Sequence, residues 1–377
     1  MFPSTPFSVP TKPRFSFRWF LTVCVVSAGL SSFGRPVVEA AVYEGFGATT
    51  SGGTGQATVV VTNLNDSGAG SLRDALSQGN RTIVFDVGGT PPPPRIITLT
   101  SGPIKVKGAF ITIDGCSAPS PQIPGISLFN AGLYLSGTKG VHDVIIKCVR
   151  VRNAVGDGIT VRDGAHHVVI DHVSAKGSTD GDIDVTRGAS DVTIQWSIIA
   201  ENDPSHNLLV LVDLQALRVT LHHNLFVKGQ SRNPHTGWDG TLATFPPDTV
   251  ADIRNNLIWD FSDYGTLAMN NVHTNVVKNF YHRSSTPSSA DRALRVNSGG
   301  QAYAQGNFSP DIDSLGNTLN IDSQGNTGQP FPFSPVVITD PCPAAQQVVD
   351  PITGAGAHPL DTFDQQYLSG ITLPSCN

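Results

Sequence analysis

The stretch VVIDHV at residues 168–173 recurs along the chain, as VTIQWS at 192–197 and VTLHHN at 219–224. Each copy alternates apolar and polar side chains, which is typical of a β-strand with one buried face. Four further copies flank these three, and equivalent positions are 23 to 32 residues apart. The equivalent positions are Val149, Val173, Ser197, Asn224, Asn256, Asn279 and Asn307. Units this short cannot bury an apolar face alone, so the sequence predicts a solenoid of stacked parallel β-coils.

The register position is asparagine in the last four copies. Asparagine tolerates the left-handed backbone conformation and can bond the backbone of its neighbours. One such residue per coil therefore predicts a ladder of stacked asparagine turns. A charged content of only 14% also suits a solenoid, because its coils share one buried core.

Both ends of a solenoid need a cover, because an open end exposes unpaired strand edges. Before the repeats, SGAGSLRDALSQG at 67–79 offers Ser71 as an N-cap, with Asp74 three residues later. We expect a short capping helix there, and we interpret the PPPP run at 91–94 as a stiff loop. Residues 309–377 are rich in Pro, Gly, Asp and Ser, so we expect an irregular tail that wraps the solenoid.

Residues 1–40 have the order of an export signal, with basic residues, then WFLTVCVVSAGL at 19–30, then the small residues of VEAA. The apolar run is shorter than the roughly 20 residues of a membrane span, although an uncleaved anchor stays an alternative. We therefore expect a secreted protein with no membrane association after cleavage. The solenoid and its N-terminal cap would then occupy residues 41–308.

The chain is acidic, with a formal charge of −6. Removing residues 1–40 takes away four basic residues and one acidic residue, which leaves −9. Nucleic acid would need a basic patch, and the sequence has none, so we expect no nucleic-acid partner. A polyanionic substrate would need a bound cation or a local arginine. We expect a monomer.

Four cysteines lie beyond residue 40, an even number that permits disulfides in an exported chain. Three sets of pairings are possible. We favour a bridge between Cys342 and Cys376, which would staple the tail, and we expect a bridge between Cys116 and Cys148 less strongly. The spacing fits no zinc motif.

The stretch TDGDIDV places three aspartates on alternate residues. In one extended strand Asp180, Asp182 and Asp184 would share a face, where either solvent dilutes their repulsion or a cation binds. Asp157 precedes Asp180 by 23 residues, about one coil, so these two should stack roughly 4.8 Å apart. A bend between Asp180 and Asp184 would let both of them and Asp157 reach one hard cation such as calcium. A solvated acidic strand edge is the alternative.

The predicted strand at 218–224, which ends in His222, His223 and Asn224, leads into SRNPH, which contains Arg232. Arg232 should lie at the mouth of the turn that leaves this strand, one or two coils beyond the aspartates and on the same side. An arginine that only bonds loop carbonyls is the alternative. We expect one of His222 and His223 to face inward and the other to lie on the surface, with no direct catalytic role for either.

Five stretches together resemble the secreted pectate lyases of the right-handed parallel β-helix superfamily. They are VTNLNDSGAGSLRDAL, TIDG, VVIDHVS, TDGDIDVTRGASDVTIQW and LRVTLHHNLFVKGQSRNPH, all within residues 44–308. The resemblance implies an all-β, right-handed parallel β-helix. It also implies that Asp157, Asp180 and Asp184 bind calcium and that Arg232 is the base.

The chain departs from this family's pattern at three positions. The motif RxPRxR reads RNPHTG here, so His235 and Gly237 replace two arginines, and Pro204 replaces the usual lysine. In the family, those cations contact substrate carboxylates. We expect His206, Lys228 and His235 to contact the substrate in this chain.

The resemblance implies β-elimination on polygalacturonate or a related acidic polysaccharide, with Arg232 removing the C5 proton. Because a base works best when its pKa lies near the working pH, an arginine base predicts an alkaline optimum. Three alternatives stay open. They are a pectin lyase that needs no calcium, a β-helix glycoside hydrolase that uses paired carboxylates, and a non-catalytic β-helix that binds polysaccharide or serves as an adhesin.

Overall fold

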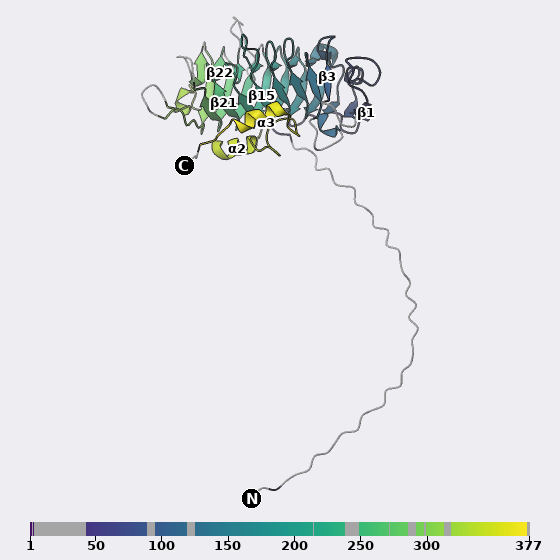
Figure 1. Cartoon of the computed structure of the whole chain (residues 1–377). Coiled ribbons are helices and arrows are strands. Elements are labelled where there is room, and N and C mark those ends of the chain that lie inside the picture. The colour runs from purple at the N-terminus through teal and green to yellow at the C-terminus, as the bar shows by residue number, and fades with distance from the viewer. Residues whose placement is uncertain are drawn as a thin grey trace. The chain divides into compact units, whose positions relative to one another are not determined.

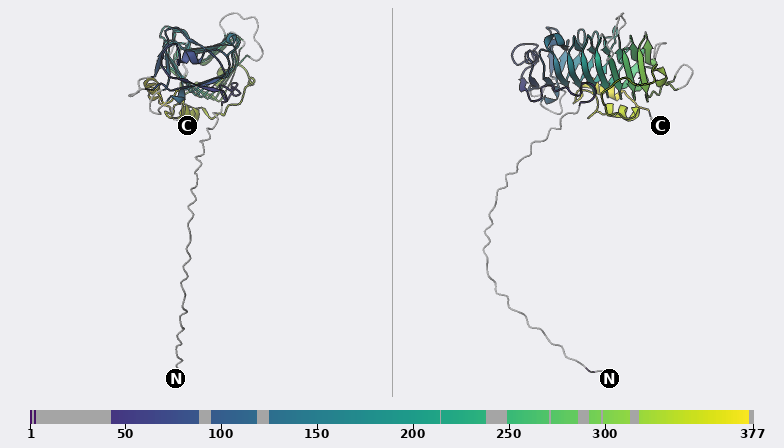
Figure 2. Two further views of the ribbon diagram at one scale, coloured as in Figure 1. Left: turned by 90° about the vertical axis from the view of Figure 1, so that its right-hand side faces the viewer. Right: turned by 180° about the vertical axis from the view of Figure 1, so that it is seen from behind.

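The computed structural model describes residues 1, 3, 43–88, 95–118, 125–213, 215–237, 249–270, 272–285, 292–297, 299–312 and 318–374. Apart from residues 1 and 3, the predicted export signal lies outside the described residues, and so does the PPPP run. The described strands belong to one compact unit, Val42–Asn377. They follow one another as coils of a solenoid, which the view along the axis shows closing around a common core (Figures 1 and 2).

A full coil contributes one strand to each of three parallel sheets, which we call A, B and C. In chain order, a coil runs through sheet C, then A, then B. Among the described residues, sheet A has ten strands: β1 (Ala57–Val61), β2 (Arg81–Phe85), β5 (Ile111–Asp114), β8 (His142–Lys147), β11 (His166–Asp171), β14 (Ser190–Gln195), β17 (Leu217–His222), β20 (Val250–Arg254), β23 (His273–Val277) and β26 (Gln301–Gln305).

Sheets B and C have eight described strands each. Sheet B contains β3 (Ile96–Thr98), β6 (Ser127–Phe129), β9 (Arg150–Arg152), β12 (Ser174–Lys176), β15 (Ile198–Ala200), β18 (Leu225–Val227), β21 (Leu257–Phe261) and β24 (Phe280–Arg283). Sheet C contains β4 (Ile104–Lys105), β7 (Leu133–Ser136), β10 (Ile159–Arg162), β13 (Ile183–Val185), β16 (Val210–Val212), β19 (His235–Thr236), β22 (Tyr264–Met269) and β25 (Arg292–Asn297). Short 3₁₀ turns are η1 (Gly115–Ser117), η2 (Gly137–Lys139) and η3 (Asp322–Gln324). The strand pairs are parallel, which confirms the predicted β-helix.

The predicted asparagine ladder is present. Ser197 N donates to Asn224 Oδ1 at 3.0 Å, and Asn224 N donates to Asn256 Oδ1 at 3.0 Å. Asn256 N continues the ladder to Asn279 Oδ1 at 2.9 Å. The left-handed residue is not the asparagine but the one before it, such as His223 with φ of +54°. The asparagine side chain instead satisfies buried backbone groups at the turn.

The predicted capping helix is present as α1 (Leu72–Ala75). Ser71 Oγ accepts a hydrogen bond from Asp74 N at 3.2 Å, which is the bond expected of an N-cap. Leu72 and Leu76 are fully buried, so the helix covers the first coils with its apolar face.

The weaker of the two disulfide expectations is confirmed. Cys116 and Cys148 are bridged, with their Cα atoms 5.1 Å apart, and the bridge joins η1 to the end of β8. Cys342 is also disulfide-bonded. Its predicted partner, Cys376, lies outside the described residues, so that pairing stays a prediction.

The tail is more regular than its composition predicts, because it contains the helices α2 (Pro341–Val348) and α3 (Thr362–Ser369). Pro341 occupies the first turn of α2, and Asp361 caps α3 by accepting from Asp364 N at 2.9 Å. Helices of eight residues are too short to show a clear apolar period. Both lie along sheet B, where they form a second apolar core with β15, β18 and β21 (Figure 1). Within the described part of the chain, no helix has the length and apolar character needed to cross a membrane.

Other parts of the chain cover much of two sheets. The segment before β1 crosses sheet A, where Gly47 N donates to Thr193 Oγ1 at 2.8 Å and Phe46 N donates to Thr220 Oγ1 at 3.0 Å. The tail helices lie on sheet B. Sheet C and the loops that lead into it carry the aspartates that the sequence singles out.

Candidate active site

Four successive loops connect sheet B to sheet C and carry the predicted site residues. We call them the site loops, and they are residues 153–158, 177–182, 201–209 and 228–234. In that order they contain Asp157, Asp180, His206 and Arg232. Asp184 follows the second loop directly, in β13. Because parallel coils stack at about 4.8 Å, residues far apart in the sequence meet at this edge of sheet C.

Asp157 and Asp180 lie on adjacent site loops, as their one-coil spacing predicts. Gly181 N donates to Asp157 Oδ1 at 3.2 Å, and Thr160 Oγ1 donates to Asp157 Oδ2 at 3.0 Å. Asp184 pairs in register with Thr160 on the neighbouring strand. Only 8% of Asp184 is exposed, and its Oδ1 lies so near Gly181 that a Cβ there would overlap it, which places this carboxylate beside the Asp180 loop.

These carboxylates disfavour one another's charge. Burial raises the pKa of Asp157, and the carboxylate of Asp180 raises it further. Burial also raises the pKa of Asp184 well above its ordinary value, with Asp157 adding to the increase and Arg232 opposing it. Asp184 Oδ1 is buried and has no hydrogen-bond partner among the described residues. A hard cation neutralises such surplus charge and binds such unsatisfied oxygens.

The donor set fits calcium in kind, because it consists of carboxylate oxygens. Within the described ranges, no three His, Cys, Asp or Glu side chains already converge as a metal site. Asp180 is turned toward His206 and Arg232. Since 53% of its side chain is exposed, Asp180 is the predicted ligand with the most freedom to change partners.

Asp182 does not share an outward row with Asp180 and Asp184, so that expectation is wrong. The strand begins only at Ile183, and the residues before it belong to a bent loop in which strand alternation does not hold. Asp182 is fully buried, and Ser178 Oγ donates to its Oδ1 at 2.9 Å. Burial raises the pKa of Asp182 well above its ordinary value.

Arg232 and His206 converge on the same carboxylate oxygen. Arg232 Nη1 lies 3.8 Å from Asp180 Oδ1, and His206 Nε2 lies 3.1 Å from that atom. His206 is 45% exposed at its side chain and Arg232 is 21% exposed, so both can contact a ligand from solvent. The structure thus places the predicted base, the three predicted calcium ligands and one predicted substrate contact in the same part of the molecule.

The backbone at Arg232 has a φ of +59°, in the left-handed region. Turn residues of other coils share this conformation, among them His172 and His223, so it belongs to the turns of the solenoid. Val210 N donates to Arg232 O at 2.7 Å. Burial raises the pKa of the Tyr264 hydroxyl, and hydrogen bonds with the Ser231 side chain and the Arg232 backbone oppose this increase. Tyr264 is a neighbour of the site that the sequence did not single out.

Two other residues expected to contact substrate have different surroundings. Lys228 Nζ lies 5.8 Å from the centre of the Tyr367 ring on α3. His235 is only 5% exposed and lies in β19, edge-to-face with Tyr264 at a ring distance of 6.4 Å. Gly237 has φ of +99°, and a Cβ there would overlap the carbonyl of Met269. A longer side chain therefore has no room at Gly237.

His222 and His223 are both buried, with 1% and 5% exposed, so the expectation of one surface histidine is wrong. Their Nδ1 atoms are 2.9 Å apart, and His223 stacks on Trp196 at a ring distance of 4.4 Å. A cavity beside these two histidines is also lined by Glu44, which precedes the first strand in the sequence, and by Val337, which lies in the tail. Both residues help to cover the histidines.

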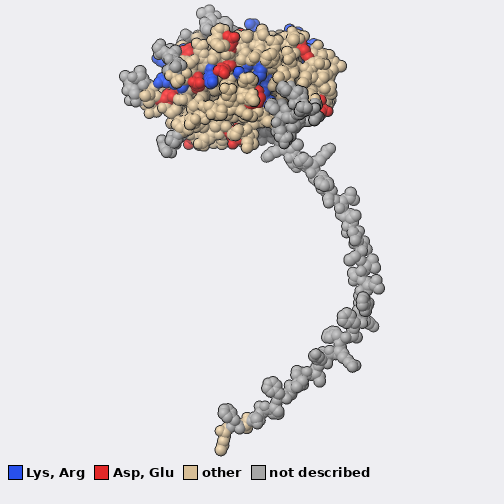
Figure 3. Space-filling model, viewed as in Figure 1, with Lys and Arg blue, Asp and Glu red and all other residues tan. Residues whose placement is uncertain are grey.

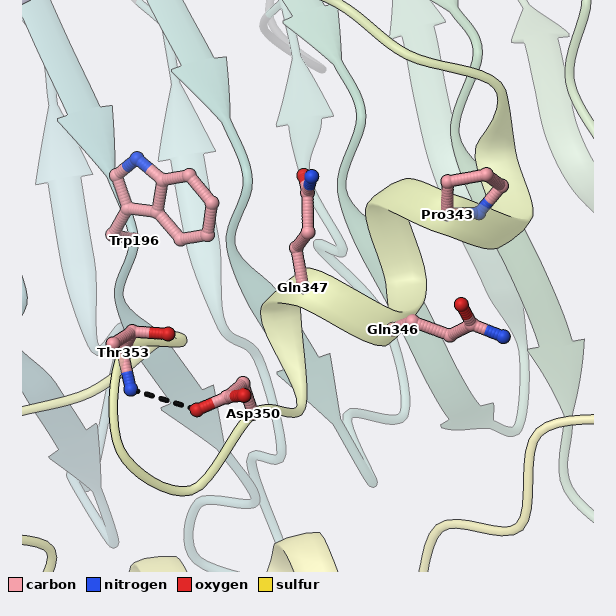
Figure 4. A pocket seen from close by; sticks show the side chains of 6 residues that line it. All are labelled: Trp196, Pro343, Gln346, Gln347, Asp350 and Thr353. Atoms are coloured by element: carbon pink, nitrogen blue, oxygen red, sulfur yellow. Dashed lines mark hydrogen bonds between the residues drawn. The ribbon is translucent and has the colours of Figure 1, made fainter. Parts of the chain in front are cut away.

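A hollow of about 350 Å³ lies between α2 and the turn that contains Trp196, and Figure 4 shows the side chains around it. Its lining residues are Trp196, Pro343, Gln346, Gln347, Asp350 and Thr353. None of them belongs to a site loop. The indole of Trp196 is stacked between His223 and His172, at 4.4 and 6.2 Å, so its edge rather than a free face meets the hollow. The site loops therefore remain the candidate active site.

The fold and the site together define a parallel β-helix with a cluster of carboxylates and an arginine where the site loops lead into sheet C. No family model matches the chain. The chain is 31% identical over 316 residues to the probable pectate lyase C of Emericella nidulans, a match that covers 82% of this chain and 68% of that protein. The probable pectate lyase C of Aspergillus oryzae is 31% identical over 297 residues, which cover 76% and 64%. Pectate lyase A of Dickeya chrysanthemi is 27% identical over 254 residues, which cover 56% and 61%.

Solved structures agree on the fold. The cedar pollen allergen Jun a 1 matches with a TM-score of 0.59 and 20% identity, over 81% of this chain and 90% of the other. The pectate lyase from Bacillus sp. N165 in complex with trigalacturonate matches with a TM-score of 0.57 and 19% identity, over 83% and 98%. This chain belongs to the pectate lyase family, and its relatives are polysaccharide lyases.

Proposed function

We propose that this protein is a secreted, calcium-dependent pectate lyase that cleaves polygalacturonate or a related acidic polysaccharide by β-elimination. The observation that carries the proposal is the 3.8 Å separation between Arg232 Nη1 and Asp180 Oδ1. It places the proposed base directly beside a proposed calcium ligand. β-Elimination next to a carboxylate needs the base and the cation at the same sugar unit.

The proposed reaction begins at C5 of a galacturonate unit, next to its C6 carboxylate. Arg232 in its neutral form takes the C5 proton, the electrons of that bond form the C4=C5 double bond, and the glycosidic oxygen leaves C4 with the electron pair of the C4–O bond and takes up a proton from water. Calcium, when bound, supplies positive charge against the substrate carboxylate as negative charge grows there. Asp157, Asp180 and Asp184 would hold it. A neutral arginine requires an alkaline medium, so the proposal includes an alkaline optimum.

Charge explains why the cation belongs in this proposal. The chain has a formal charge of −6, and polygalacturonate is a polyanion. On the face that Figure 3 shows, acidic and basic side chains are interspersed rather than gathered into a basic patch. Three carboxylates in the site would repel a uronate, whereas a divalent ion held by them would offset most of their charge and could itself bind a uronate oxygen. His206, beside Asp180, is the proposed local contact for a substrate carboxylate.

A second candidate is a β-helix that binds polysaccharide without cutting it, and the stretch RNPHTG at 232–237 supports it. His235 is buried and Gly237 has no room for a side chain, so neither position presents the cation that an arginine would supply. Weaker binding of the substrate carboxylates could then leave recognition without turnover.

The test is ultraviolet absorbance of polygalacturonate incubated with purified residues 41–377, with calcium and with a chelator, beside the Arg232→Ala variant. The proposal expects calcium-dependent formation of unsaturated products that is lost in the variant. Products that form equally well with chelator on methyl-esterified substrate would favour a pectin lyase. Retention in a polygalacturonate gel without any absorbance change would favour the binding protein.

A further inference from the structure

The site loops are clipped together by the side chains of two asparagines. Asn202 is only 6% exposed. Its Oδ1 accepts from Ser178 N at 2.9 Å, and its Nδ2 donates to Asp180 O at 3.0 Å and also to Leu208 O. One amide therefore joins the loop of Asp180 to both ends of the loop that contains His206.

Asn207 continues this connection to the next loop. Its Oδ1 accepts from Asn202 N at 2.9 Å, and its Nδ2 donates to Lys228 O at 2.8 Å. Its carbonyl accepts from Gln230 N at 3.1 Å and from Ser231 N at 3.3 Å. The last of these bonds ends one residue before Arg232.

The two asparagines thus form a continuous hydrogen-bonded path from the backbone of Asp180 to the residue before Arg232. Backbone bonds also join these loops, among them Asp182 N to Leu209 O at 2.8 Å and Val210 N to Arg232 O at 2.7 Å, and the side-chain bonds add to them where strand pairing is sparse. A buried amide that uses its acceptor and both donor hydrogens permits little variation in geometry. The separation between Asp180 and Arg232 therefore depends on this path.

We propose that Asn202 is a positioning residue for the site, which fixes Asp180 relative to Arg232, and that Asn207 transmits this placement to the Arg232 loop. The inference rests on the proposed function and deepens it. Neither asparagine needs to touch the substrate or an ion. This role has no signature in the sequence, because both asparagines lie in the turn-rich stretch ENDPSHN.

The chain offers a matched control in Asn256, which is 1% exposed in the asparagine ladder. Its Nδ2 donates to Leu221 O at 2.9 Å, and its Oδ1 accepts from Asn224 N at 3.0 Å. It lies at the turn from sheet A to sheet B, whereas Asn202 lies between sheets B and C. Replacing either asparagine by alanine removes a buried amide with similar bonds, but only one of the two belongs to the site loops.

The experiment compares Asn202→Ala, Asn207→Ala and Asn256→Ala with the wild type. Terbium luminescence and its displacement by calcium measure ion binding, thermal unfolding measures stability, and initial rates at saturating calcium measure kcat. We expect all three variants to lower the unfolding temperature. Only the two site-loop variants should weaken calcium binding about tenfold or reduce kcat by about tenfold to a hundredfold, as for other residues that orient ligands.

Asn207 is less buried than Asn202, so Asn207→Ala tests the path even if Asn202→Ala fails to fold. If a folded site-loop variant matches Asn256→Ala in both calcium affinity and kcat while the wild type binds calcium and forms product, the positioning role is wrong and the proposed function stands. If the wild type neither binds calcium nor forms product, the proposed function fails and the positioning role fails with it.

Discussion

Arg232 and Asp180 lie on different site loops, with 3.8 Å between Nη1 and Oδ1. The carboxylate serves the arginine as a partner and the proposed calcium site as a ligand, so Asp180→Asn should affect both. We expect calcium affinity to fall about tenfold, roughly 1.4 kcal/mol, and elimination to fall further. Stability should change little, because 53% of the Asp180 side chain is exposed. Calcium titration and thermal unfolding of the same samples measure the two effects.

Asp203→Asn is the control for Asp180→Asn. Asp203 lies in the neighbouring site loop, and its Oδ1 accepts from Ser205 N at 2.8 Å. The change in formal charge is the same in both variants, but Asp203 faces its own turn. If Asp203→Asn weakened calcium binding as much as Asp180→Asn, general electrostatics rather than ligation by Asp180 would explain the effect.

The backbone of Gly181, in the Asp180 loop, lies directly against the carboxylate of Asp184. A Cβ at Gly181 would overlap Asp184 Oδ1, the buried oxygen that has no hydrogen-bond partner in the described residues. Gly181→Ala should therefore displace that carboxylate, lower stability by about 1–3 kcal/mol and weaken calcium binding. Gly88→Ala is the control, because a Cβ there meets nothing within 4 Å. Unchanged calcium binding in Gly181→Ala would show that Asp184 is not a ligand.

The spacing of residues in the sequence was enough to predict the parallel β-helix and the approach of the Asp157 and Asp180 loops. Because the coils stack, the interval between Ser197 and Asn224 reappears as a backbone-to-side-chain bond of 3.0 Å. The interval between Asp157 and Asp180 likewise brings two loops together. Equivalent residues of successive coils are neighbours in a parallel solenoid, so a repeat interval in its sequence predicts which residues are in contact.

The contacts made within the site loops could not be predicted from the sequence, because these loops do not follow the two-residue alternation of a β-strand. Alternation placed Asp182 beside Asp184, but the chain bends before Ile183 and buries Asp182 under Ser178. The roles of Asn202 and Asn207 depend on bonds between loops of different coils, for which a single loop sequence gives no signal. Such side-chain contacts are decided by the tertiary structure and not by local propensity.

The tail is anchored by buried charges, which allows a direct test of its contribution to stability. Arg152 Nη2 contacts Asp361 Oδ2 and Asp364 Oδ1, both at 2.9 Å. Asp364 is 1% exposed, and the fully buried Arg150 lies beside it. Asp364→Asn removes one charge from this group, so we expect a loss of about 3 kcal/mol in the free energy of unfolding. Denaturant unfolding measures the loss, and limited proteolysis should release the tail first.

The surface pair of Lys278 and Asp340 is the control for this charge group. Their Nζ and Oδ1 atoms are 3.0 Å apart, but 78% of the Asp340 side chain is exposed. Asp340→Asn should cost less than about 1 kcal/mol. Equal losses in Asp364→Asn and Asp340→Asn would mean that burial of the first group adds nothing to the docking of the tail.

His223 makes stability depend on pH in a direction that can be stated. Burial lowers its pKa to about 4, from an ordinary value of 6.5. Between these values His223 is protonated in the unfolded chain but not in the folded one. Its contribution to the free energy of unfolding is therefore complete above pH 6.5 and is lost as the pH falls toward 4. Buried Asp182 has a raised pKa and acts in the opposite direction. Comparison of wild type with His223→Asn, both in chelator, cancels that opposing effect. Relative to the variant, the wild type should lose up to about 3 kcal/mol between pH 6.5 and 4. Parallel stability curves over that range would show that His223 titrates normally in the folded protein.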